Sequence, residues 1–181
     1  LAPNGRRIGP DPASLQAAEV GGIVANNASG MCCGVAENSY RTVESLDLVL
    51  ADGFRLNTAE PSADERLRAE RPAIHAGLLD LRREVLANKP LCDRVRKAFE
   101  TKNTVGYRLG AFLDAEKPAE ILRRLVVGSE GTLAFLASAT FQTLPLPRCR
   151  ATAFLLFPTV EDAGAAVALL AEAGVAAAEL L

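Results

Sequence analysis

Two glycine-rich polar turns, residues 21–30 (GGIVANNASG) and 128–133 (GSEGTL), carry most of the residues that suit ligand binding. Glycines let the backbone approach a bulky anionic or planar ligand and leave N–H groups free to donate, while Asn and Ser add short amide and hydroxyl donors. The first turn therefore suits a phosphate or the edge of a heteroaromatic ring. In the second, Glu130 can accept a hydrogen bond from a ribose hydroxyl, as acidic residues do in dinucleotide sites.

Each turn, taken alone, is also typical of an ordinary connection. A Gly-Gly pair often only joins a loop to a helix, and Gly-Ser-Glu-Gly is common in surface turns. The density of small polar residues over residues 21–30, with apolar Ile23 and Val24 among them, favours a packed segment over a mobile one. The motifs of nucleophilic catalysis, of paired carboxylates, of the P-loop and of the Rossmann turn do not occur in the sequence.

Cysteine and histidine are too sparse for a metal centre. Cys32 and Cys33 are adjacent, Cys92 and Cys149 are isolated, and no C-x-x-C or Cys/His cluster is present. The single histidine, His75, falls in a predicted helix, where we expect a surface or boundary position. We therefore expect free thiols in a reducing compartment and no metal ligands in the chain.

Composition limits the class of protein and of partner. A chain of 181 residues with 49% hydrophobic and 23% charged residues predicts a soluble globular chain of about one domain. The net charge of −2 argues against a nucleic-acid or membrane-surface partner. The most apolar stretch, residues 163–181, is interrupted by Glu172, Gly174 and Glu179, so we expect no membrane span. Because Met31 is the only methionine and the chain opens at Leu1, we also expect a piece of a longer polypeptide carrying part of a site.

Strand and helix signals alternate in blocks along the chain. Residues 45–50, the turn Asp52-Gly53 and residues 54–57 predict a β-hairpin. A strand buried mainly on one face is predicted by the alternating Leu133, Phe135, Ala137, Ala139 and Phe141. The remaining signals predict five helices. Two are identified by their caps, a short one from Pro12 capped by Asp11 and one opened by a Ser62/Glu65 capping box. The other three are one from Pro72 with Ile74, Leu78, Leu81 and Val85 on one face, one near Pro90 carrying Leu91, Val95 and Phe99, and one from Pro118 to about Leu125.

The pattern resets after Pro145 and Pro147. Residues 151–157 predict a strand, Thr159 with Asp162 predicts a helix cap, residues 160–173 predict a helix ended by Gly174, and a further strand is expected from Val175. This strand-helix-strand unit predicts that a second domain begins near residue 150.

Four segments together resemble the FAD-linked oxidases of the vanillyl-alcohol oxidase / PCMH type, and most closely their D-lactate and D-2-hydroxyglutarate dehydrogenase branch. They are residues 10–14 (PDPAS), 21–30, 102–107 (KNTVGY) and 127–133 (VGSEGTL). Residues 31–34 and 38–42 resemble the large members that also carry a C-terminal iron–sulfur region. The resemblance is strong over residues 8–60 and 100–145.

The resemblance implies an α+β fold in which FAD lies between two subdomains beneath a cap domain. Residues 1–149 are expected to form the second FAD-binding subdomain, an antiparallel sheet flanked by helices with a helical insert over about 62–125. Residues 150–181 are expected to begin the cap domain with its first strand-helix-strand. The family's upstream P-x-G-x-G-T-S-like loop should then lie before Leu1, and the cap's histidine-rich metal and base residues beyond Leu181.

The branch resembled binds FAD non-covalently, so Cys32 and Cys33 are expected to be buried or semi-buried thiols with no covalent flavin. Carried over residue by residue, the resemblance implies FAD contacts in three groups. Residues 11–14 should lie near the adenosine and pyrophosphate, residues of the first turn along the ribityl chain and ring, and residues 130–133 by the adenosine end. The full set is Asp11, Pro12, Ala13, Ser14, Gly21, Gly22, Asn26, Asn27, Ala28, Ser29, Gly30, Glu130, Gly131, Thr132 and Leu133. The sequence departs from the family at Ala134-Phe135, where Gly-Ile is commoner. No catalytic or metal residue is expected within the chain.

The implied activity is oxidation of a D-2-hydroxy acid of the lactate, glycolate or 2-hydroxyglutarate class by hydride transfer to flavin. With only part of the site, the chain alone should bind FAD weakly or not at all and should not turn over. The resemblance does not indicate the electron acceptor, and it leaves open an iron–sulfur cluster in a missing C-terminal region. We expect a cytoplasmic location, and peripheral membrane attachment through missing regions stays open. The alternative is a non-catalytic structural or interaction module with the same fold, which the absence of the upstream loop would favour.

Overall fold

The computed structural model describes residues 1–179 and divides the chain into two compact units. One unit is Ile8–Leu144, and the other combines Leu1–Arg7 with the chain from Pro145 onward. Leu180 and Leu181, at the end of the last predicted strand, lie outside the described residues. The predicted start of a cap domain near residue 150 stays a prediction.

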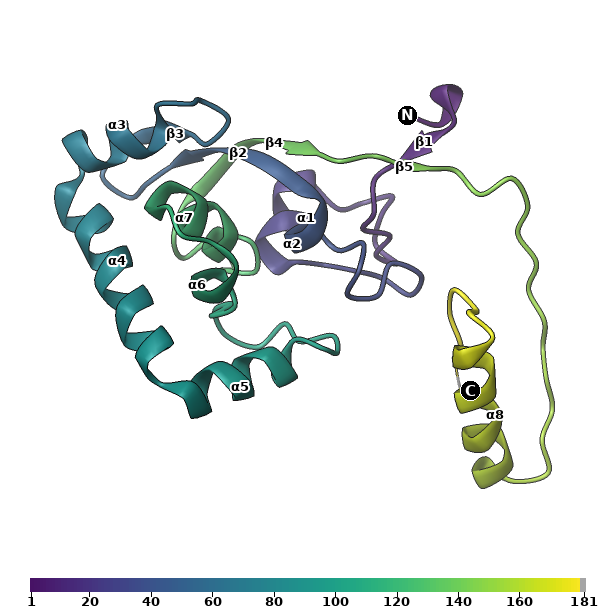
Figure 1. Cartoon of the computed structure of the whole chain (residues 1–181). Helices are drawn as coiled ribbons and strands as arrows, with labels where there is room; N and C mark the ends of the chain where they lie inside the picture. Colours follow the sequence, from purple (N-terminus) through teal and green to yellow (C-terminus); the bar gives the residue numbers. More distant parts are fainter. Residues whose placement is uncertain (180–181) are drawn as a thin grey trace. The chain divides into compact units, whose positions relative to one another are not determined.

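The larger unit is built on a small antiparallel sheet (Figure 1). Its strands, in the order β3-β2-β4, are β3 (Arg55–Asn57), β2 (Val43–Val49) and β4 (Phe135–Phe141). The predicted hairpin is confirmed, with Leu48 opposite Leu56 and a backbone bond from the N–H of Leu50 to the carbonyl of Phe54 at 2.9 Å. Gly53 closes the loop at φ 84°, a left-handed conformation that glycine adopts without strain.

Strand β4 does not follow the predicted alternation. Asp47 pairs with Ser138 but Leu48 pairs with Leu136, so the register skips Ala137. Such a bulge shifts the period-two pattern by one residue. Phe135 is consequently 72% exposed, while Leu136 packs against the core, which corrects the prediction that Phe135 and Ala137 lie on the buried face.

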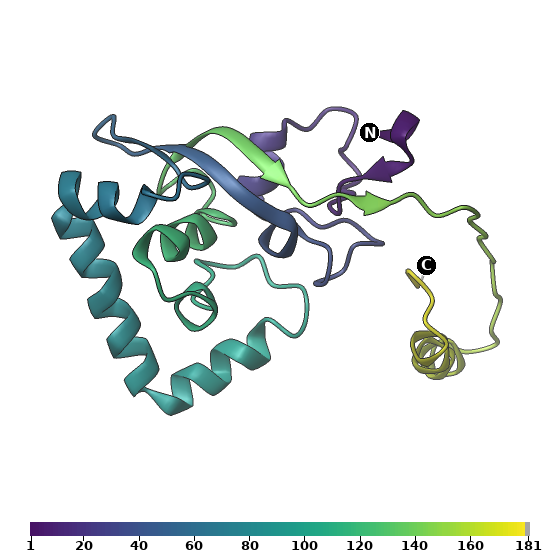
Figure 2. The ribbon, with the colours of Figure 1, turned by 45° about the horizontal axis from the view of Figure 1, so that its top comes forward.

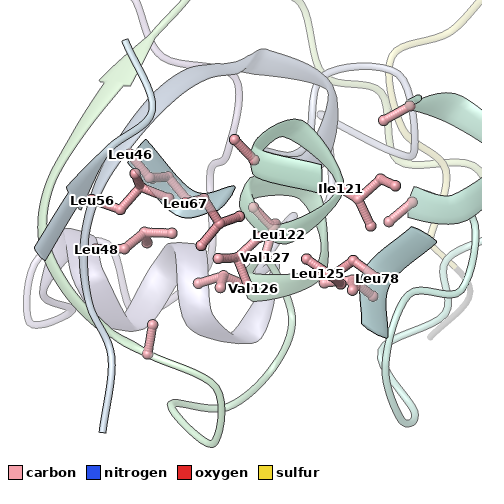
Figure 3. Close-up of a cluster of buried hydrophobic side chains, with 14 of the residues drawn as sticks. Leu46, Leu48, Leu56, Leu67, Leu78, Ile121, Leu122, Leu125, Val126 and Val127 are labelled. Atoms are coloured by element: carbon pink, nitrogen blue, oxygen red, sulfur yellow. The ribbon is translucent and has the colours of Figure 1, made fainter. Parts of the chain in front are cut away.

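The core lies between the sheet and α7 (Pro118–Val126). Figure 3 shows Leu46, Leu48 and Leu56 from the strands facing side chains of α7. Helix α7 forms because Pro118 presets its first turn and its apolar residues recur at helical spacing. Its buried residues are Pro118, Ala119, Ile121, Leu122, Leu125 and Val126.

Three helices follow one another around α7 and the short α6 (Ala111–Asp114), as Figures 1 and 2 show from two directions. They are α3 (Ala63–Glu70), α4 (Pro72–Ala87) and α5 (Lys89–Ala98), which confirms the predicted helices. The prediction that Leu81 shares the buried face of α4 is wrong, since Leu81 is 49% exposed. Arg82 beside it donates to the carbonyl of Ala115 at 2.9 Å.

The predicted capping box at α3 is also wrong. The Ser62 side chain makes no capping hydrogen bond, and its ψ of 5° is far from the extended conformation that an N-cap needs. Another side chain of this first turn, Asp64, contacts two other helices: its Oδ1 accepts from the N–H of Ala119 at 3.0 Å and its Oδ2 lies 3.3 Å from His75 Nε2. A carboxylate in the first turn of α3 thus holds the start of α7.

The N-terminal part of this unit differs from the prediction in two ways. No helix starts at Pro12, where the backbone forms turns closed by bonds such as Leu15 N–H to Pro12 O at 2.9 Å. A helix occurs instead at α1 (Val20–Asn26), so the Gly21-Gly22 pair is helical and not part of a turn. The other short helix, α2 (Ser39–Thr42), is capped by the Asn38 side chain, which accepts from the N–H of Arg41.

The smaller unit contains little regular structure. A 3-10 turn (Ala2–Asn4) precedes β1 (Arg6–Arg7), which pairs with β5 (Leu144–Pro145), and α8 (Val160–Glu172) follows. The predicted cap of α8 is confirmed, since Thr159 Oγ1 accepts from the N–H of Asp162 at 3.1 Å. The predicted strands at residues 151–157 and from Val175 are absent from the described residues, because no neighbouring strand pairs with these segments there.

Candidate functional site

The C-terminal end of α1 contacts the second glycine-rich turn directly. The N–H groups of Gly128 and Glu130 donate to the carbonyls of Val24 at 3.1 Å and Ala25 at 2.9 Å. Asn26 Nδ2 also donates to Glu130 Oε1 at 2.6 Å. The last carbonyls of a helix have no intrahelical partner, so the turn satisfies groups that would otherwise need water. The two segments singled out in the sequence therefore form one junction.

Left-handed backbone conformations let the two segments approach each other. Asn27 (φ 51°) ends α1 and Glu130 (φ 53°) lies in the turn between Gly128 (φ 88°) and Gly131 (φ 75°). A Cβ on Gly128 would lie 3.5 Å from the Cβ of Asn27, so only ordinary contact separates the two segments at this point. Asn tolerates this conformation better than most residues, which explains Asn27 at the helix end.

The side chain of Asn27 is committed to the fold. It is 6% exposed, and its Oδ1 accepts from the N–H of Tyr40 at 3.0 Å. This bond ties the end of α1 to α2. A ligand beside the junction would thus meet the backbone around Asn27 more readily than its amide oxygen.

Asp11 closes the loop that follows the first segment. Its N–H donates to the carbonyl of Ser29 at 2.8 Å, and its carboxylate accepts from the N–H groups of Cys32 at 3.3 Å and Cys33 at 3.2 Å. The backbone passes so close to Gly30 (φ 84°) that a Cβ there would lie 2.1 Å from the Asp11 carbonyl oxygen. Asp11 and Gly30 therefore bring residues 10–14 next to the first segment.

The adjacent cysteines lie in different environments. Cys32 is exposed, which corrects the expectation that both thiols are buried or semi-buried, whereas Cys33 is 2% exposed. The Cys33 thiol donates to the carbonyl of Ser29 at 2.6 Å. Burial, reinforced by the charge of Asp11, raises the pKa of Cys33 to about 11. The Cys33 thiol is consequently protonated and unreactive near neutral pH.

Two buried hydroxyls at the junction lack a hydrogen-bond partner among the described residues. They are Ser29 Oγ and Ser129 Oγ, one in each glycine-rich segment, and each residue is 2% exposed. A buried polar group left without a partner costs about 1–3 kcal/mol. Such groups mark places where water or a ligand completes the hydrogen bonding.

The other predicted site residues line the same region at different depths. Ala13, Ser14, Gly22, Asn26, Glu130, Gly131 and Thr132 are exposed, whereas Asp11, Pro12, Gly21, Ala28, Gly30 and Leu133 are half-buried. The exposed members carry the carboxylate of Glu130, the amide of Asn26 and the hydroxyls of Ser14 and Thr132. Their arrangement suits a neutral or anionic ligand rich in hydroxyl groups.

Sequence reasoning gave no role to residues 107 and 108, although residues 102–107 were part of the resemblance. The hydroxyls of Tyr107 and Thr132 lie 2.8 Å apart, so this third segment reaches the second turn. Arg108 is buried between the rings of Tyr40 and Phe99, with its Cζ 3.7 Å and 4.2 Å from their centroids. The sequence around residues 107 and 108 carries no signal for these positions, because both depend on contacts with residues distant in the chain.

Two hollows on the surface of the described residues lie away from the predicted site residues. Two shallow hollows are lined by side chains of α4 and α5 (Leu86, Lys89, Cys92, Asp93 and Arg96) and by side chains near β3 (Asp47, Arg55, Asn57, Glu60 and Arg66). Neither includes a predicted site residue. Among residues 1–179, no group of His, Cys, Asp and Glu side chains has an arrangement for a metal ion, and no helix is long and apolar enough to cross a membrane.

Two similarities to known proteins cover this part of the chain. Residues 1–59 match the FAD binding domain family. Over 96% of its length the chain is 27% identical to a D-2-hydroxyglutarate dehydrogenase of Pantoea ananatis (strain AJ13355). The chain spans 17% of the length of that relative. The family match and this similarity support a likeness of the chain to the FAD-linked oxidases of the D-lactate and D-2-hydroxyglutarate dehydrogenase branch.

Proposed function

We propose that the chain is the FAD-binding portion of a flavin-dependent oxidoreductase that oxidises a D-2-hydroxy acid. The observation that carries the proposal is the junction, in which Glu130 and Gly128 bind the carbonyl end of α1. The family match supports FAD, and the relative's name supports 2-hydroxyglutarate or a similar hydroxy acid as the substrate class.

The residues at the junction fit the polar parts of FAD. The unpartnered hydroxyls of Ser29 and Ser129 suit a ribityl chain, ribose hydroxyls and phosphate oxygens. No Cβ would meet an atom within 4 Å at Gly22 or Gly131, so space is open beside both backbones. Residues 130–133 would lie by the adenosine, residues 22–30 along the ribityl chain, and residues 11–14 near the pyrophosphate.

The site residues would have two different roles, shaping the loops and contacting the cofactor. Asp11 and Asn27 would shape the loops, because their side-chain oxygens already accept backbone N–H groups. Glu130 would accept a hydrogen bond from a ribose hydroxyl, while the hydrogen bond that Asn26 Nδ2 donates to Glu130 Oε1 fixes the orientation of the carboxylate. When bound, FAD supplies the hydride acceptor, and this chain supplies position and electrostatics.

The test uses the full-length polypeptide that contains this chain. We expect it to purify with flavin absorbance, to release the flavin on denaturation, and to reduce an artificial electron acceptor with D-lactate, glycolate or D-2-hydroxyglutarate. The Glu130→Ala variant should bind FAD about tenfold more weakly, as expected for loss of one hydrogen bond to a carboxylate. Glu161→Ala, a change at an exposed acid in α8, should leave binding unchanged.

Two outcomes would contradict the proposal. A full-length protein that neither retains nor binds FAD would return the chain to a structural or interaction role. A flavin that stays attached after denaturation would contradict non-covalent binding. The 181-residue chain alone should bind FAD weakly or not at all, so a flavin-saturated preparation of it would show that the site is more complete than proposed.

A further inference from the structure

The segment between α5 and α6 is anchored at both ends by one buried arginine. The guanidinium of Arg108 lies between the rings of Tyr40 and Phe99, and the residue is only 6% exposed. Tyr40 is itself fixed, since its hydroxyl donates to Asp114 Oδ2 at 2.8 Å. Phe99 follows α5 and Tyr40 belongs to α2, so this stack of Tyr40, Arg108 and Phe99 joins two helices that are far apart in sequence.

The residues between Phe99 and Arg108 are ordered by their own hydrogen bonds. Asn103 Nδ2 donates to the carbonyl of Ala98 at 3.4 Å, and Asn103 Oδ1 accepts from the N–H of Val105 at 3.0 Å. Gly106 then turns the chain at φ 70°, which favours glycine. The segment therefore reaches Tyr107 in a defined conformation.

Tyr107 faces the opposite way from its neighbour Arg108. Tyr107 is 47% exposed, and its hydroxyl lies 2.8 Å from Thr132 Oγ1. Thr132 donates its only hydroxyl proton to the carbonyl of Ser129 at 2.6 Å. Tyr107 must consequently be the donor to Thr132, which leaves the phenol oxygen able to accept one further hydrogen bond.

We propose that Tyr107 is a further FAD-contacting residue, lying against the adenosine half of the cofactor, and that Arg108 is its positioning residue. This inference rests on the proposed function, which puts Thr132 and Glu130 at the adenosine end. The phenol oxygen accepts a hydrogen bond from a ribose hydroxyl or the adenine amino group, and the exposed ring covers part of the adenosine. Aromatic side chains of this kind commonly pair a large apolar face with one polar contact.

The experiment compares two flavins on the apo form of the full-length polypeptide. FAD carries the adenosine and FMN lacks it, so fluorescence titration with each separates contacts to the two halves. Tyr107→Ala should weaken FAD binding about tenfold or more and leave FMN binding unchanged, while Tyr107→Phe, which keeps the ring, should lose less. The matched control is Val105→Ala, because Val105 is 87% exposed on the same segment and should have no effect on either flavin.

A double variant separates positioning by Arg108 from a general effect on folding. Arg108→Ala should weaken FAD binding about as much as Tyr107→Ala, and combining the two changes should add little, because both remove one contact. Arg108→Lys keeps a cation between the rings and should recover part of the FAD affinity. Thermal unfolding of each variant identifies any that has not folded, and the Tyr107 variants test the proposal independently of Arg108.

The outcomes distinguish the proposed function from the role of Tyr107. A wild-type protein that does not bind FAD overturns the proposed function. A wild-type protein that binds FAD while Tyr107→Ala binds it equally well overturns only the role of Tyr107. Equal weakening of FAD and FMN overturns the placement at the adenosine. Full additivity of Arg108→Ala and Tyr107→Ala overturns the positioning role of Arg108.

Discussion

The larger unit and the C-terminal segment, residues 150–179, use similar apolar residues with opposite results. In the larger unit, Leu48 and Leu56 on β2 and β3 are 0% exposed. In the C-terminal segment, Phe154 is 77%, Leu156 83% and Leu169 68% exposed. The difference is the presence of partners, because an apolar side chain is buried only when a second element covers it.

The same difference separates strands from helices. Helix α8 forms in the C-terminal segment because its hydrogen bonds lie within the helix and Thr159 caps its start. Residues 151–157 have strand-like composition but form no strand, since a strand needs its bonds from a neighbour. Local signals are therefore sufficient for the helix and insufficient for the strand.

The largest expected effect contrasts two leucines. Leu48→Ala should lower the free energy of unfolding of the 181-residue chain by about 2–5 kcal/mol, because Leu48 is fully buried in the core. Leu156→Ala should change it by less than about 0.5 kcal/mol, as for other exposed positions. Urea unfolding followed by circular dichroism measures both. A large loss at Leu156 would mean that the C-terminal segment is packed in solution.

The parts of the fold that the sequence predicted share a local origin. The hairpin around Gly53 and the helices opened by Pro72 and Pro118 depend on residues adjacent in the chain. The bulge at Ala137 could not be predicted, because it is defined by the register with β2. The capping box of Ser62 and Glu65 failed because the backbone of Ser62, with a ψ of 5°, is not extended, and the local sequence does not indicate this.

A smaller effect is expected when two left-handed glycines are compared. Gly30→Ala should destabilise the larger unit by about 1–3 kcal/mol from backbone strain, and the contact with the Asp11 carbonyl should add to this. Gly174 (φ 77°) has the same backbone conformation but no atom within 4 Å of an added Cβ. Gly174→Ala should therefore cost about 1 kcal/mol, and only at the end of α8. Equal effects in urea unfolding would show that the approach of Asp11 to Gly30 is not tight in solution.

The sequence identified the residues of the candidate site but not the contacts between them. The sequence identified both glycine-rich segments and the residues in them that carry donors. It did not indicate that Gly128 and Glu130 would bind the end of α1, because the first segment was expected to be a turn. Nor did it separate Asp11 and Asn27, whose side chains shape the loops, from Glu130, whose side chain is exposed. These distinctions arise from contacts between residues distant in sequence.

Removing one helix cap in each region should cost about 1 kcal/mol of stability, in the whole larger unit for one cap and in α8 alone for the other. Asn88→Ala removes the side chain that accepts from the N–H of Leu91 at 3.1 Å, and should lower the stability of the whole larger unit because α5 packs Cys92 and Val95 into it. Thr159→Ala should reduce the helicity of α8 alone, since Ala163 is its one buried residue. Hydrogen exchange at the amides of each helix measures both. A Thr159→Ala effect on the unfolding of β2 would contradict independence of the two regions.

The smallest expected effect concerns a surface ion pair on the sheet. Arg55 Nη2 lies 2.5 Å and its Nε 3.0 Å from the carboxylate oxygens of Asp47, and the hydrogen bonds from Arg55 hold the pKa of Asp47 below its usual value. A lowered pKa in the folded state adds stability above the unfolded pKa of about 3.9, and this stability is lost as the pH falls through the folded value. Because the Arg55 side chain is 69% exposed, the contribution should stay below about 1 kcal/mol.

Asp47→Asn should accordingly lower the free energy of unfolding slightly at pH 7, and the difference from the wild type should shrink as the pH falls below about 4. The matched change in the C-terminal segment, Glu161→Gln at an exposed position in the first turn of α8, should have no such effect on the unfolding of the larger unit. Urea unfolding of both variants and the wild type between about pH 3 and about pH 7 measures these differences. If the difference between Asp47→Asn and wild type stayed constant with pH, the pair would contribute through packing alone, and its charge would add nothing to the sheet.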